Sequence, residues 1–465
     1  MERPGTAERP LRVAVIGSGP AGFYTVQHLL QSDDRVIEID MYERLPTPFG
    51  LVRYGVAPDH QKIKAVTKIY HKLATNPRFR FCGNVDYGRH LSLADLKRHY
   101  HQVVFSTGAQ TDRRLGIPGE DLAGSHSATE FVAWYNGHPD YTGLQFDLSV
   151  PAAVVVGVGN VAVDVARILC RTPEELATTD IADYALEALR RSAVRRVYLL
   201  GRRGPAQAAF TNPEVKELGN LPDAETRTLA EDLAPDETDP ASPEATDKAT
   251  LRKLEILRSL VDRREPAKSR KLEIRFLVSP TEILGDGDGR VRGVRLVRNR
   301  LRLDAKGRLR AEPTDRTDEL EAGLVFRSVG YRGEPLPDLP FREDWATVPN
   351  DRGRITDGPG GPPLRGLYVA GWIKRGPTGV IGTNKPDAGE TVESMLEDLQ
   401  AGLLLDPDRP ETGALERQLE GRGARVVSYP DWLRLDAIEV SRGEPLGRPR
   451  VKITDSADFV KALEA

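Results

Sequence analysis

The 465-residue chain has very little cysteine, no long apolar run and almost no net charge. Its two cysteines, Cys82 and Cys170, lie far apart, which excludes a disulfide framework, a Cys-x-x-Cys redox pair and a cysteine-ligated iron–sulfur cluster within the chain. No stretch of about 18 apolar residues is present, so no membrane span is expected. The 66 basic and 69 acidic residues leave a net charge of -3, which gives no general argument for a nucleic-acid partner.

The N-terminus and the overall composition are typical of a globular cytoplasmic protein. Residues 1–9 carry Glu2 and Glu8 and contain no apolar core, which argues against a signal or transit peptide. Hydrophobic residues make up 39% of the chain and charged residues 29%, as in a folded protein rather than a disordered one. The length corresponds to about three average domains. We therefore expect a folded protein located in the cytoplasm.

The first informative segment has the pattern of a dinucleotide-binding unit. It begins with a Val-rich apolar run at 11–16, which predicts a buried strand of a parallel sheet. The run leads directly into GSGPAG at 17–22, and an amphipathic helical pattern over 23–30 follows. A second strand is predicted over 36–42. The order strand, glycine turn, helix, strand is that of a βαβ unit for a dinucleotide.

Each glycine of this turn has a separate task in such a unit. Gly17 permits the tight turn, Gly19 lets the backbone approach a pyrophosphate, and Gly22 lets the helix and strand pack closely. The helix N-terminus offers free N–H groups and a partial positive charge to the pyrophosphate. Glu43, about twenty residues further on, can accept hydrogen bonds from a ribose diol. The alternative interpretation is a glycine-rich turn with a solvated Glu43.

The same order of elements recurs at 152–203, but different residues follow its second strand. A strand leads into Gly157-Val158-Gly159-Asn160-Val161-Ala162, a helix follows, and the next strand ends in Arg202-Arg203 instead of an acid. Two guanidiniums suit a 2′-phosphate, which a carboxylate would repel, so this copy predicts NADP and not NAD. The alternative is two solvated arginines at a strand end. Glu214 lies just beyond and would by itself be assigned to a surface helix.

Together, the two units predict a flavoenzyme that uses both FAD and NADPH. The acidic end fits FAD and the arginine pair fits NADPH, so we expect hydride transfer from the nicotinamide to the flavin N5. The protein would supply position and electrostatics. Because the chain has no internal dithiol, the electrons must pass to an external acceptor or to oxygen.

Three further segments carry weaker signals. The acidic, Pro-, Ala- and Thr-rich segment 223–247 predicts a surface excursion without a catalytic role. Basic residues alternate with Val and Leu over 290–310, which predicts the exposed face of an antiparallel hairpin or, alternatively, a docking patch. The tail up to residue 465 holds two short helical patterns and no obvious chemistry.

Four long strings resemble one known family. RLPTPFGLVRYGVAPDH at 44–60, GNVAVDVAR at 159–167, GRRGP at 201–205 and GWIKRGPTGVIGTN at 371–384 are similar to adrenodoxin reductase and to the bacterial ferredoxin–NADP reductases of that type. The resemblance extends from about residue 11 into the tail. It implies an FAD-dependent oxidoreductase in which NADPH reduces FAD and FAD passes single electrons to a ferredoxin. That ferredoxin would serve cytochromes P450 or other reductive pathways.

The resemblance also implies which residues contact each cofactor. Residues implied for FAD, beyond the glycines of the first turn, are Ala21, Glu43, Leu51, Val85, Trp372, Gly379, Val380 and Ile381. Those implied for NADP are Gly157, Gly159, Asn160, Val161, Arg202, Arg203, Glu214 and Gly379. Gly379 would touch both cofactors. Trp372 has a plain alternative as core filler, because buried tryptophans are common.

Two polar residues are candidates for groups near the reacting rings. His60 lies in the APDH turn and Asp164 early in the second binding helix. Hydride transfer needs no strong acid or base, so we expect either residue to tune orientation and flavin protonation. His60 could instead be a hydrogen-bonded structural histidine. Asp164 could equally be an inward carboxylate that bonds backbone or ribose.

We predict an α/β fold with two Rossmann-like dinucleotide-binding domains, the FAD domain being discontinuous. Residues 11–110 would form its first part, 111–330 the NADP domain, and 331–465 the second part of the FAD domain with the tail. A monomer or weak dimer is expected. An acidic ferredoxin would need a basic rim, for which Lys216, Lys374 and Arg375 are candidates.

Two other functions remain open at this point. The first is an NADPH-dependent flavin monooxygenase, although the Phe-x-Gly-x-x-x-His-x-x-x-Trp-Pro string of the Baeyer–Villiger type is missing from the sequence. The second is an electron-transfer subunit of a larger complex, resembling the small subunit of glutamate synthase. Such subunits usually carry extra cysteines for clusters, and two isolated cysteines argue against this role.

Overall fold

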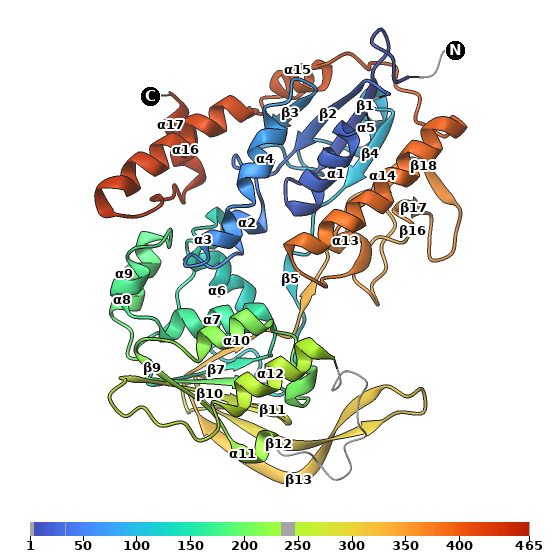
Figure 1. Cartoon of the computed structure of the whole chain (residues 1–465). Helices are drawn as coiled ribbons and strands as arrows, with labels where there is room; N and C mark the ends of the chain where they lie inside the picture. Colours follow the sequence, from blue (N-terminus) through green and yellow to red (C-terminus); the bar gives the residue numbers. More distant parts are fainter. Residues whose placement is uncertain (1–3, 33, 234–246, 465) are drawn as a thin grey trace.

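The computed structural model describes residues 4–32, 34–233 and 247–464, and it contains two large sheets. The first sheet has the order β16-β17-β18-β4-β1-β2-β3 and draws strands from both ends of the chain (Figure 1). Its strands are β1 (Leu11–Ile16), β2 (Ile37–Tyr42), β3 (Phe79–Cys82), β4 (Gln102–Phe105), β16 (Asn350–Asp351), β17 (Arg354–Thr356) and β18 (Pro363–Val369).

The second sheet comes wholly from the middle of the chain. Its order is β6-β14-β7-β8-β10-β9, and every pairing in it is parallel. All residues of β1 and of the corresponding strand β7 are buried, as expected for strands covered on both faces. The strands are β6 (Ser125–Ser127), β7 (Ala152–Val156), β8 (Arg196–Leu200), β9 (Ala224–Thr228), β10 (Arg270–Arg275) and β14 (Leu324–Arg327).

Helices cover both sheets and connect their strands. Around the first sheet lie α1 (Pro20–Leu30), α2 (Leu51–Tyr54), α3 (Gln61–Lys64), α4 (Thr67–Ala74), α5 (Leu93–His99), α13 (Trp372–Arg375) and α14 (Asn384–Ala401). Around the second lie α6 (Ala128–Tyr135), α7 (Asn160–Cys170), α8 (Pro173–Leu176), α9 (Asp183–Arg190), α10 (Asn212–Leu218), α11 (Ala230–Leu233) and α12 (Lys248–Arg258). None of the helices in the described ranges is both long and apolar enough to cross a membrane.

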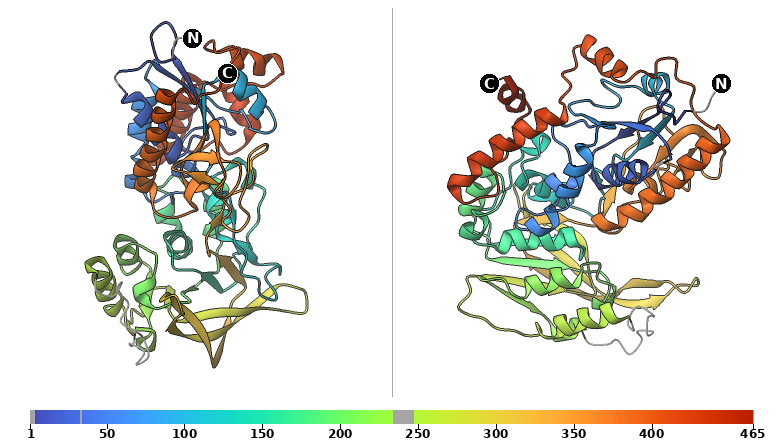
Figure 2. Two further views of the ribbon diagram at one scale, coloured as in Figure 1. Left: turned by 90° about the vertical axis from the view of Figure 1, so that its right-hand side faces the viewer. Right: turned by 45° about the horizontal axis from the view of Figure 1, so that its top comes forward.

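Two smaller sheets complete the architecture. The short strands β5 (Thr111–Asp112) and β15 (Tyr331–Arg332) pair where the chain passes between the large sheets (Figure 1). The antiparallel strands β11 (Val278–Gly285), β12 (Val291–Leu303) and β13 (Leu309–Glu321) form the other one. Both views in Figure 2 show the yellow β12–β13 hairpin extending away at the end opposite the two termini.

The predicted local elements are largely confirmed. Both βαβ units form, and the basic run 290–310 lies in the predicted antiparallel hairpin. The first helix begins at Pro20, inside the glycine turn, because the fixed φ of proline suits the first helical position.

The prediction of a surface excursion over 223–247 is wrong for its first part. Residues 224–228 form the buried strand β9, and the Asp232 carboxylate of α11 is fully buried. Its Oδ2 lies 2.8 Å from Arg275 Nε, and it also pairs with Arg298. Composition could not reveal this, because pairing with β10 and two arginine partners, all distant in sequence, decide the burial. Residues 234–246 lie outside the described residues.

The prediction for the tail is also corrected. It forms three helices and not two: α15 (Ala414–Gly421), α16 (Tyr429–Gly443) and α17 (Ser456–Glu464). Several of its charged side chains are buried against other parts of the chain, including Glu439, Arg448 and Lys452. The tail is therefore a structural part of both halves of the molecule.

Candidate functional site

The first glycine turn has the tight geometry that the sequence predicts. Gly17 has a φ of +101°, and a Cβ there would lie 2.7 Å from the carbonyl oxygen of Ser106. A Cβ on Gly22 would lie 2.3 Å from the Gly17 oxygen, so α1 packs directly on the turn. Gly19 precedes the helix and has nothing within 4 Å of its Cβ position. The turn therefore leaves open space next to the N–H groups of the helix start, as a bound pyrophosphate requires.

Glu43 lies immediately behind this turn. Its carboxylate accepts hydrogen bonds from the hydroxyl of Ser18 at 2.6 Å, from the Ser18 N–H at 3.1 Å and from the Leu45 N–H at 3.0 Å. The Val85 N–H donates to the Glu43 carbonyl at 2.8 Å, which places Val85 beside it. The acid is thus held at the C-terminal end of β2, where the ribose of a dinucleotide would lie.

Distant segments meet the same turn. Gly50, which precedes Leu51 at the start of α2, would bring a Cβ to 3.0 Å from the Gly19 Cα. Gly371, which precedes Trp372, would bring one to 2.5 Å from the Cβ of Ala21. Backbone therefore approaches the first turn closely from both the N-terminal and the C-terminal parts of the chain.

The predicted residues 379–381 follow Trp372 through a short loop. The indole N–H of Trp372 donates to the Thr378 carbonyl at 3.1 Å. Gly379 has a φ of +82°, and a Cβ there would meet the Thr383 hydroxyl at 2.3 Å, so no other residue fits without strain. Val380 is 51% exposed, and Ile381 packs against the core of the first sheet.

The second glycine turn repeats the geometry of the first. Gly157 has a φ of +133°, and a Cβ there would lie 2.1 Å from the Ser328 oxygen, whereas Gly159 at the start of α7 has nothing within 4 Å. Asn160 Oδ1 accepts from the Thr211 N–H at 3.0 Å and so ties the turn to the start of α10. Val161 packs against the core of the second sheet.

The arginine pair lies where the sequence predicts it, after β8. The side chains of Arg202 and Arg203 are exposed. Neither guanidinium forms an ion pair with any side chain that the structure describes. Two unpaired cations therefore stand at the end of the second unit, where the first unit carries Glu43.

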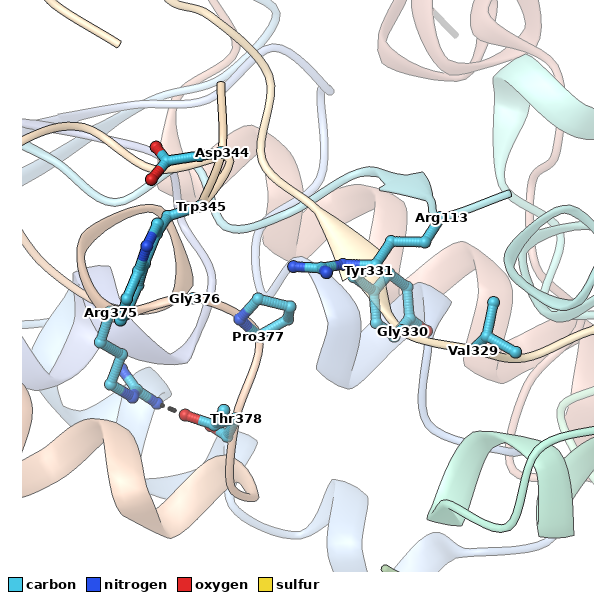
Figure 3. A pocket seen from close by; sticks show the side chains of 10 residues that line it. All are labelled: Arg113, Val329, Gly330, Tyr331, Asp344, Trp345, Arg375, Gly376, Pro377 and Thr378. Carbon is cyan, nitrogen blue, oxygen red and sulfur yellow. Dashed lines mark hydrogen bonds between the residues drawn. The ribbon is translucent and has the colours of Figure 1, made fainter. Parts of the chain in front are cut away.

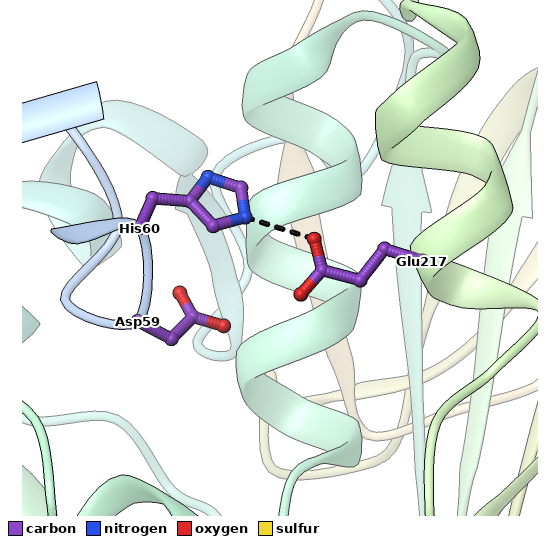
Figure 4. Close-up of side chains that lie close together, drawn as sticks. All are labelled: Asp59, His60 and Glu217. Carbon is purple, nitrogen blue, oxygen red and sulfur yellow. Dashed lines mark hydrogen bonds and ion pairs between the residues drawn. The ribbon is translucent and has the colours of Figure 1, made fainter. Parts of the chain in front are cut away.

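The two catalytic candidates meet at a junction between the two halves of the molecule. His60 comes from the loop before α3, and Asp164 comes from α7. His60 Nδ1 lies 4.0 Å from Asp164 Oδ1, and His60 Nε2 lies 4.0 Å from an oxygen of Glu214 on α10. A third carboxylate, that of Glu217, bonds His60 Nε2 at 2.9 Å (Figure 4). The predicted residues His60, Asp164 and Glu214 are therefore brought together.

Sequence reasoning missed the cation at the centre of this cluster. Arg167 is fully buried and pairs with Asp59 at 2.7 Å, Asp164 at 2.6 Å and Glu214 at 3.3 Å. Its guanidinium already balances the carboxylates that could otherwise hold a metal ion with His60. One signal was present in the sequence: an arginine stands at the end of the mainly apolar stretch VAVDVAR, in the helix predicted after the second glycine turn.

Burial and charge shift the pKa values of the carboxylates. Burial raises the pKa of Asp164, and the charges of Arg167 and His60 offset only part of that effect. Burial, followed by the neighbouring charge of Asp164, raises the pKa of Glu214. Burial also opposes ionisation of Asp59, but the hydrogen bond and charge of Arg167 hold its pKa well below the usual range. Neighbouring acids in one cluster thus differ strongly in their affinity for a proton.

The His60–Glu217 pair behaves differently. Burial lowers the pKa of His60 and is the largest effect, but the hydrogen bond to Glu217 and the charges of Asp164 and Asp59 outweigh burial and the opposing charge of Arg167. The pKa of His60 is therefore raised. The same hydrogen bond lowers the pKa of Glu217. The junction can hold a proton on His60 next to carboxylates that accept one more readily than usual.

A cavity of about 470 Å³ opens beside Tyr331 (Figure 3). The ring of Tyr331 in its wall lies 5.3 Å from the Trp372 ring. Arg113 and Arg375 contribute guanidiniums to this wall and Asp344 contributes a carboxylate. The lining residues are Arg113, Val329, Gly330, Tyr331, Asp344, Trp345, Arg375, Gly376, Pro377 and Thr378.

The predicted basic rim is not a single surface. The Lys374 ammonium is buried and bonds Glu390 at 2.7 Å, so it is not available to a partner. Arg375 pairs with Asp387 at 3.2 Å. Lys216 lies on α10, which packs around the second sheet, whereas Lys374 and Arg375 lie on α13, which packs around the first.

Comparison with known proteins gives consistent matches. Residues 11–199 match the family model "Pyridine nucleotide-disulphide oxidoreductase". NADPH-ferredoxin reductase FprA of Mycobacterium tuberculosis is 44% identical over 464 residues, covering 97% of this chain and 99% of that protein. Human mitochondrial NADPH:adrenodoxin oxidoreductase is 44% identical over 467 residues, covering 98% and 93%. The structure of M. tuberculosis FprA in complex with NADPH matches with a TM-score of 0.92 and 45% identity, covering 98% of this chain and all of that one.

Proposed function

The chain belongs to the adrenodoxin reductase-type ferredoxin–NADP reductases, and on that premise we propose that it transfers electrons from NADPH through FAD to a ferredoxin. The observation that carries the proposal is a pair of glycine turns that are followed by residues of opposite charge. One turn is followed by the carboxylate of Glu43 and the other by the guanidiniums of Arg202 and Arg203. One chain therefore offers a site for a ribose diol and a site for a 2′-phosphate.

The residues present fit both cofactors. Gly19 and Gly159 leave open space at the start of α1 and α7, where N–H groups and the helix dipole favour a pyrophosphate. When bound, FAD accepts two electrons from NADPH and passes them on one at a time. For FAD we propose Gly17, Gly19, Ala21, Gly22, Glu43, Leu51, Val85, Trp372, Gly379, Val380 and Ile381. For NADP we propose Gly157, Gly159, Asn160, Val161, Arg202, Arg203, Glu214 and Gly379.

The junction cluster is the proposed polar part of the site. His60 and Asp164 would orient the reacting groups and hold a proton near them. The ion pairs of Arg167 support this role, because they join Asp59 on the N-terminal side to Asp164 and Glu214 on the NADP side. The cluster thus links the two halves across which the electrons must travel.

We also propose the domain limits 11–110, 111–330 and 331–465, with FAD bound by the first and last parts. Support comes from the β5–β15 pair, whose strands lie at 111–112 and 331–332, where these parts join. A cytoplasmic location is proposed as well. Both cysteines are buried and free, which fits a reducing compartment. A monomer or weak dimer stays a prediction.

Anaerobic stopped-flow mixing tests the function. The flavin-loaded protein is mixed first with NADPH or NADH and then with an oxidised ferredoxin. We expect the flavin absorbance to bleach with NADPH, to bleach slowly or not at all with NADH, and to return rapidly with ferredoxin. Bleaching that ferredoxin does not reverse, but oxygen reverses quickly, would instead indicate a monooxygenase.

A further inference from the structure

The main chain of the arginine pair is fixed by its neighbours. Three consecutive carbonyls of the turn 201–203 accept hydrogen bonds. The Val278 N–H donates to the first at 3.1 Å, the Asn299 side-chain amide to the second at 2.9 Å, and the Leu277 N–H to the third at 3.1 Å. Two of these donors belong to the chain entering β11, and only Asn299 donates from a side chain.

The position of Asn299 depends on an irregularity in β12. The pairing of β12 with β13 shifts register between Val297 and Asn299, and Asn299 is only 5% exposed. Its own N–H donates to the Leu277 carbonyl at 2.7 Å. The side-chain Nδ2 donates to Arg202 O and also to Ser279 Oγ at 2.8 Å, so both of its hydrogens are used.

The hairpin touches the far side of the turn as well. A Cβ on Gly204 would lie 3.4 Å from Leu301 Cδ1, and Leu301 is buried. Arg300, between Asn299 and Leu301, is exposed. In this arginine-rich stretch, Asn299 and Leu301 therefore face the turn while the basic side chain between them faces away.

A fixed main chain with unpaired side chains is a preorganised arrangement. The guanidiniums of Arg202 and Arg203 have no ionic partner in the described part of the chain. The main-chain carbonyls of residues 201–203, in contrast, all accept hydrogen bonds. A ligand that pairs with these cations must order their side chains but not their backbone. Reducing the ordering cost in this way increases affinity.

We propose that Asn299 is a positioning residue for NADP specificity. By holding the Arg202 carbonyl, its amide keeps both guanidiniums oriented toward the 2′-phosphate of the cofactor. This inference rests on the proposed function, and it makes a narrower claim. Losing the Asn299 amide must weaken ligands that carry a 2′-phosphate and leave unchanged those that do not.

The test is the variant Asn299→Leu, which removes both donors and keeps a branched side chain with the same number of heavy atoms. Equilibrium binding of adenosine 2′,5′-bisphosphate and of adenosine 5′-monophosphate to the flavin-loaded protein is measured by calorimetry. We expect affinity for the bisphosphate to fall about fivefold, the usual effect of one hydrogen bond. Affinity for the monophosphate should not change. In steady state with ferricyanide, KM for NADPH should rise by the same factor at constant kcat.

Two variants provide the controls. Thr314→Val removes a comparable hydrogen bond in the same hairpin, from the Thr314 hydroxyl to the Arg298 carbonyl at 2.8 Å, and should leave both affinities unchanged. The double variant Arg202→Ala/Arg203→Ala is the reference for a protein that has lost its preference for the 2′-phosphate completely. If Asn299→Leu does not fold, Asn299→Ser, whose hydroxyl is too short to replace the amide, takes its place.

The outcomes separate the inference from the function. An Asn299 variant that keeps the wild-type preference, while the double arginine variant loses it, would overturn the inference and leave the function intact. Equal weakening of both ligands would also overturn it, because Asn299 would then be a general structural residue. A wild-type protein without any preference for the bisphosphate would contradict the proposed use of NADP itself.

Discussion

At the scale of single residues, the two glycine turns differ in the charge that follows them. The Glu43 carboxylate is held by Ser18 beside the first turn, whereas Arg202 and Arg203 stand unpaired by described side chains at the second. A carboxylate favours a ribose diol and repels a phosphate, and guanidiniums do the reverse. Under the proposed function, exchange of one such residue should therefore change cofactor selectivity without changing the fold.

The first prediction concerns the arginine pair. Replacing Arg202 and Arg203 with alanine should raise the Michaelis constant for NADPH at least about tenfold, because each charge-assisted hydrogen bond contributes about 1.5–3 kcal/mol. The constant for NADH should change little, since NADH carries no 2′-phosphate. Steady-state kinetics with both nucleotides measures the effect. An unchanged preference for NADPH would show that these two arginines do not bind the 2′-phosphate.

The second prediction concerns the His60–Glu217 pair. In Glu217→Gln the pKa of His60 should fall, because the hydrogen bond to the carboxylate is what outweighs burial. NMR of ¹³C-labelled histidine measures that pKa. The His71 ring bonds the Tyr429 hydroxyl at 3.0 Å and, within the described part of the chain, forms no hydrogen bond or ion pair with Glu217, so its NMR signals serve as the internal control.

The same pair gives a pH dependence of stability with a defined sign. The pKa of His60 is raised, so its contribution is present below about pH 6.5 and is lost as the pH rises through the folded-state pKa. The pKa of Glu217 is lowered, so its contribution is present above about pH 4.5 and is lost on acidification. Urea unfolding should therefore show the largest deficit of Glu217→Gln between these limits. A deficit that is constant from pH 4 to pH 9 would contradict the pairing.

At the scale of elements, a short acidic helix serves as the buried partner of a strand and a hairpin. Asp232 on α11 bonds Arg275 of β10 at 2.8 Å and also pairs with Arg298 of β12. It also accepts from the Phe276 N–H at 3.0 Å. The carboxylate thus links the second sheet to the antiparallel sheet next to it.

The third prediction follows from this contact. Asp232→Asn should lower the free energy of unfolding by about 3–5 kcal/mol, because it removes the charge of the buried carboxylate that Arg275 and Arg298 share and leaves Arg275 with its longer contacts to Glu231 and Glu273, at 3.7 and 3.6 Å. The adjacent Glu231 is the matched control: its side chain is 45% exposed and lies 3.7 Å from Arg275 and 3.2 Å from Arg316. Glu231→Gln should cost at most about 1 kcal/mol. Urea denaturation measures the free energy of unfolding of both variants. Equal decreases in the two variants would contradict the role of Asp232.

At the scale of the whole molecule, the C-terminal tail connects the two halves. The Lys452 ammonium donates to the carbonyls of Arg53, in α2, and of Asn136, after α6, at 3.3 and 3.0 Å. Asp180, between α8 and α9, lies 3.4 Å from Lys452 and 2.7 Å from Lys64 of α3. In Figure 1 the red helix α16 accordingly lies next to the green helices α8 and α9.

The fourth prediction tests this connection. Asp180→Asn leaves the buried ammoniums of Lys64 and Lys452 without a carboxylate and should cost about 3–5 kcal/mol of stability. Protection from hydrogen exchange should fall in the tail and around Lys64 together. Asp183→Asn is the control, because the Asp183 side chain is 63% exposed although it pairs with Arg448. Loss of protection confined to the neighbourhood of residue 180 would show that the tail does not join the halves.

The glycine turns show how much of this protein could be predicted from its sequence. In each unit the strand, the glycine turn, the helix start and the charge that follows lie within about 50 positions of one another, so local pattern was sufficient to predict them. The close contacts at Gly17 and Gly157 come from distant segments, at Ser106 and Ser328. The hairpin at 290–310 was predictable for the same reason, since alternation reports which side of a strand is exposed.

The junction and the buried acids depended on the tertiary structure. Arg167 meets Asp59 from 108 positions away and Glu214 from 47, and no local pattern specifies such partners. The burial of Asp232 depends likewise on strands that fold next to it. The sequence by itself determined the two glycine turns and the charges that follow them, because these are local matters of backbone freedom and residue type. The tertiary structure alone decided which charges lie away from water and with which partners, because burial is a property of the assembled chain.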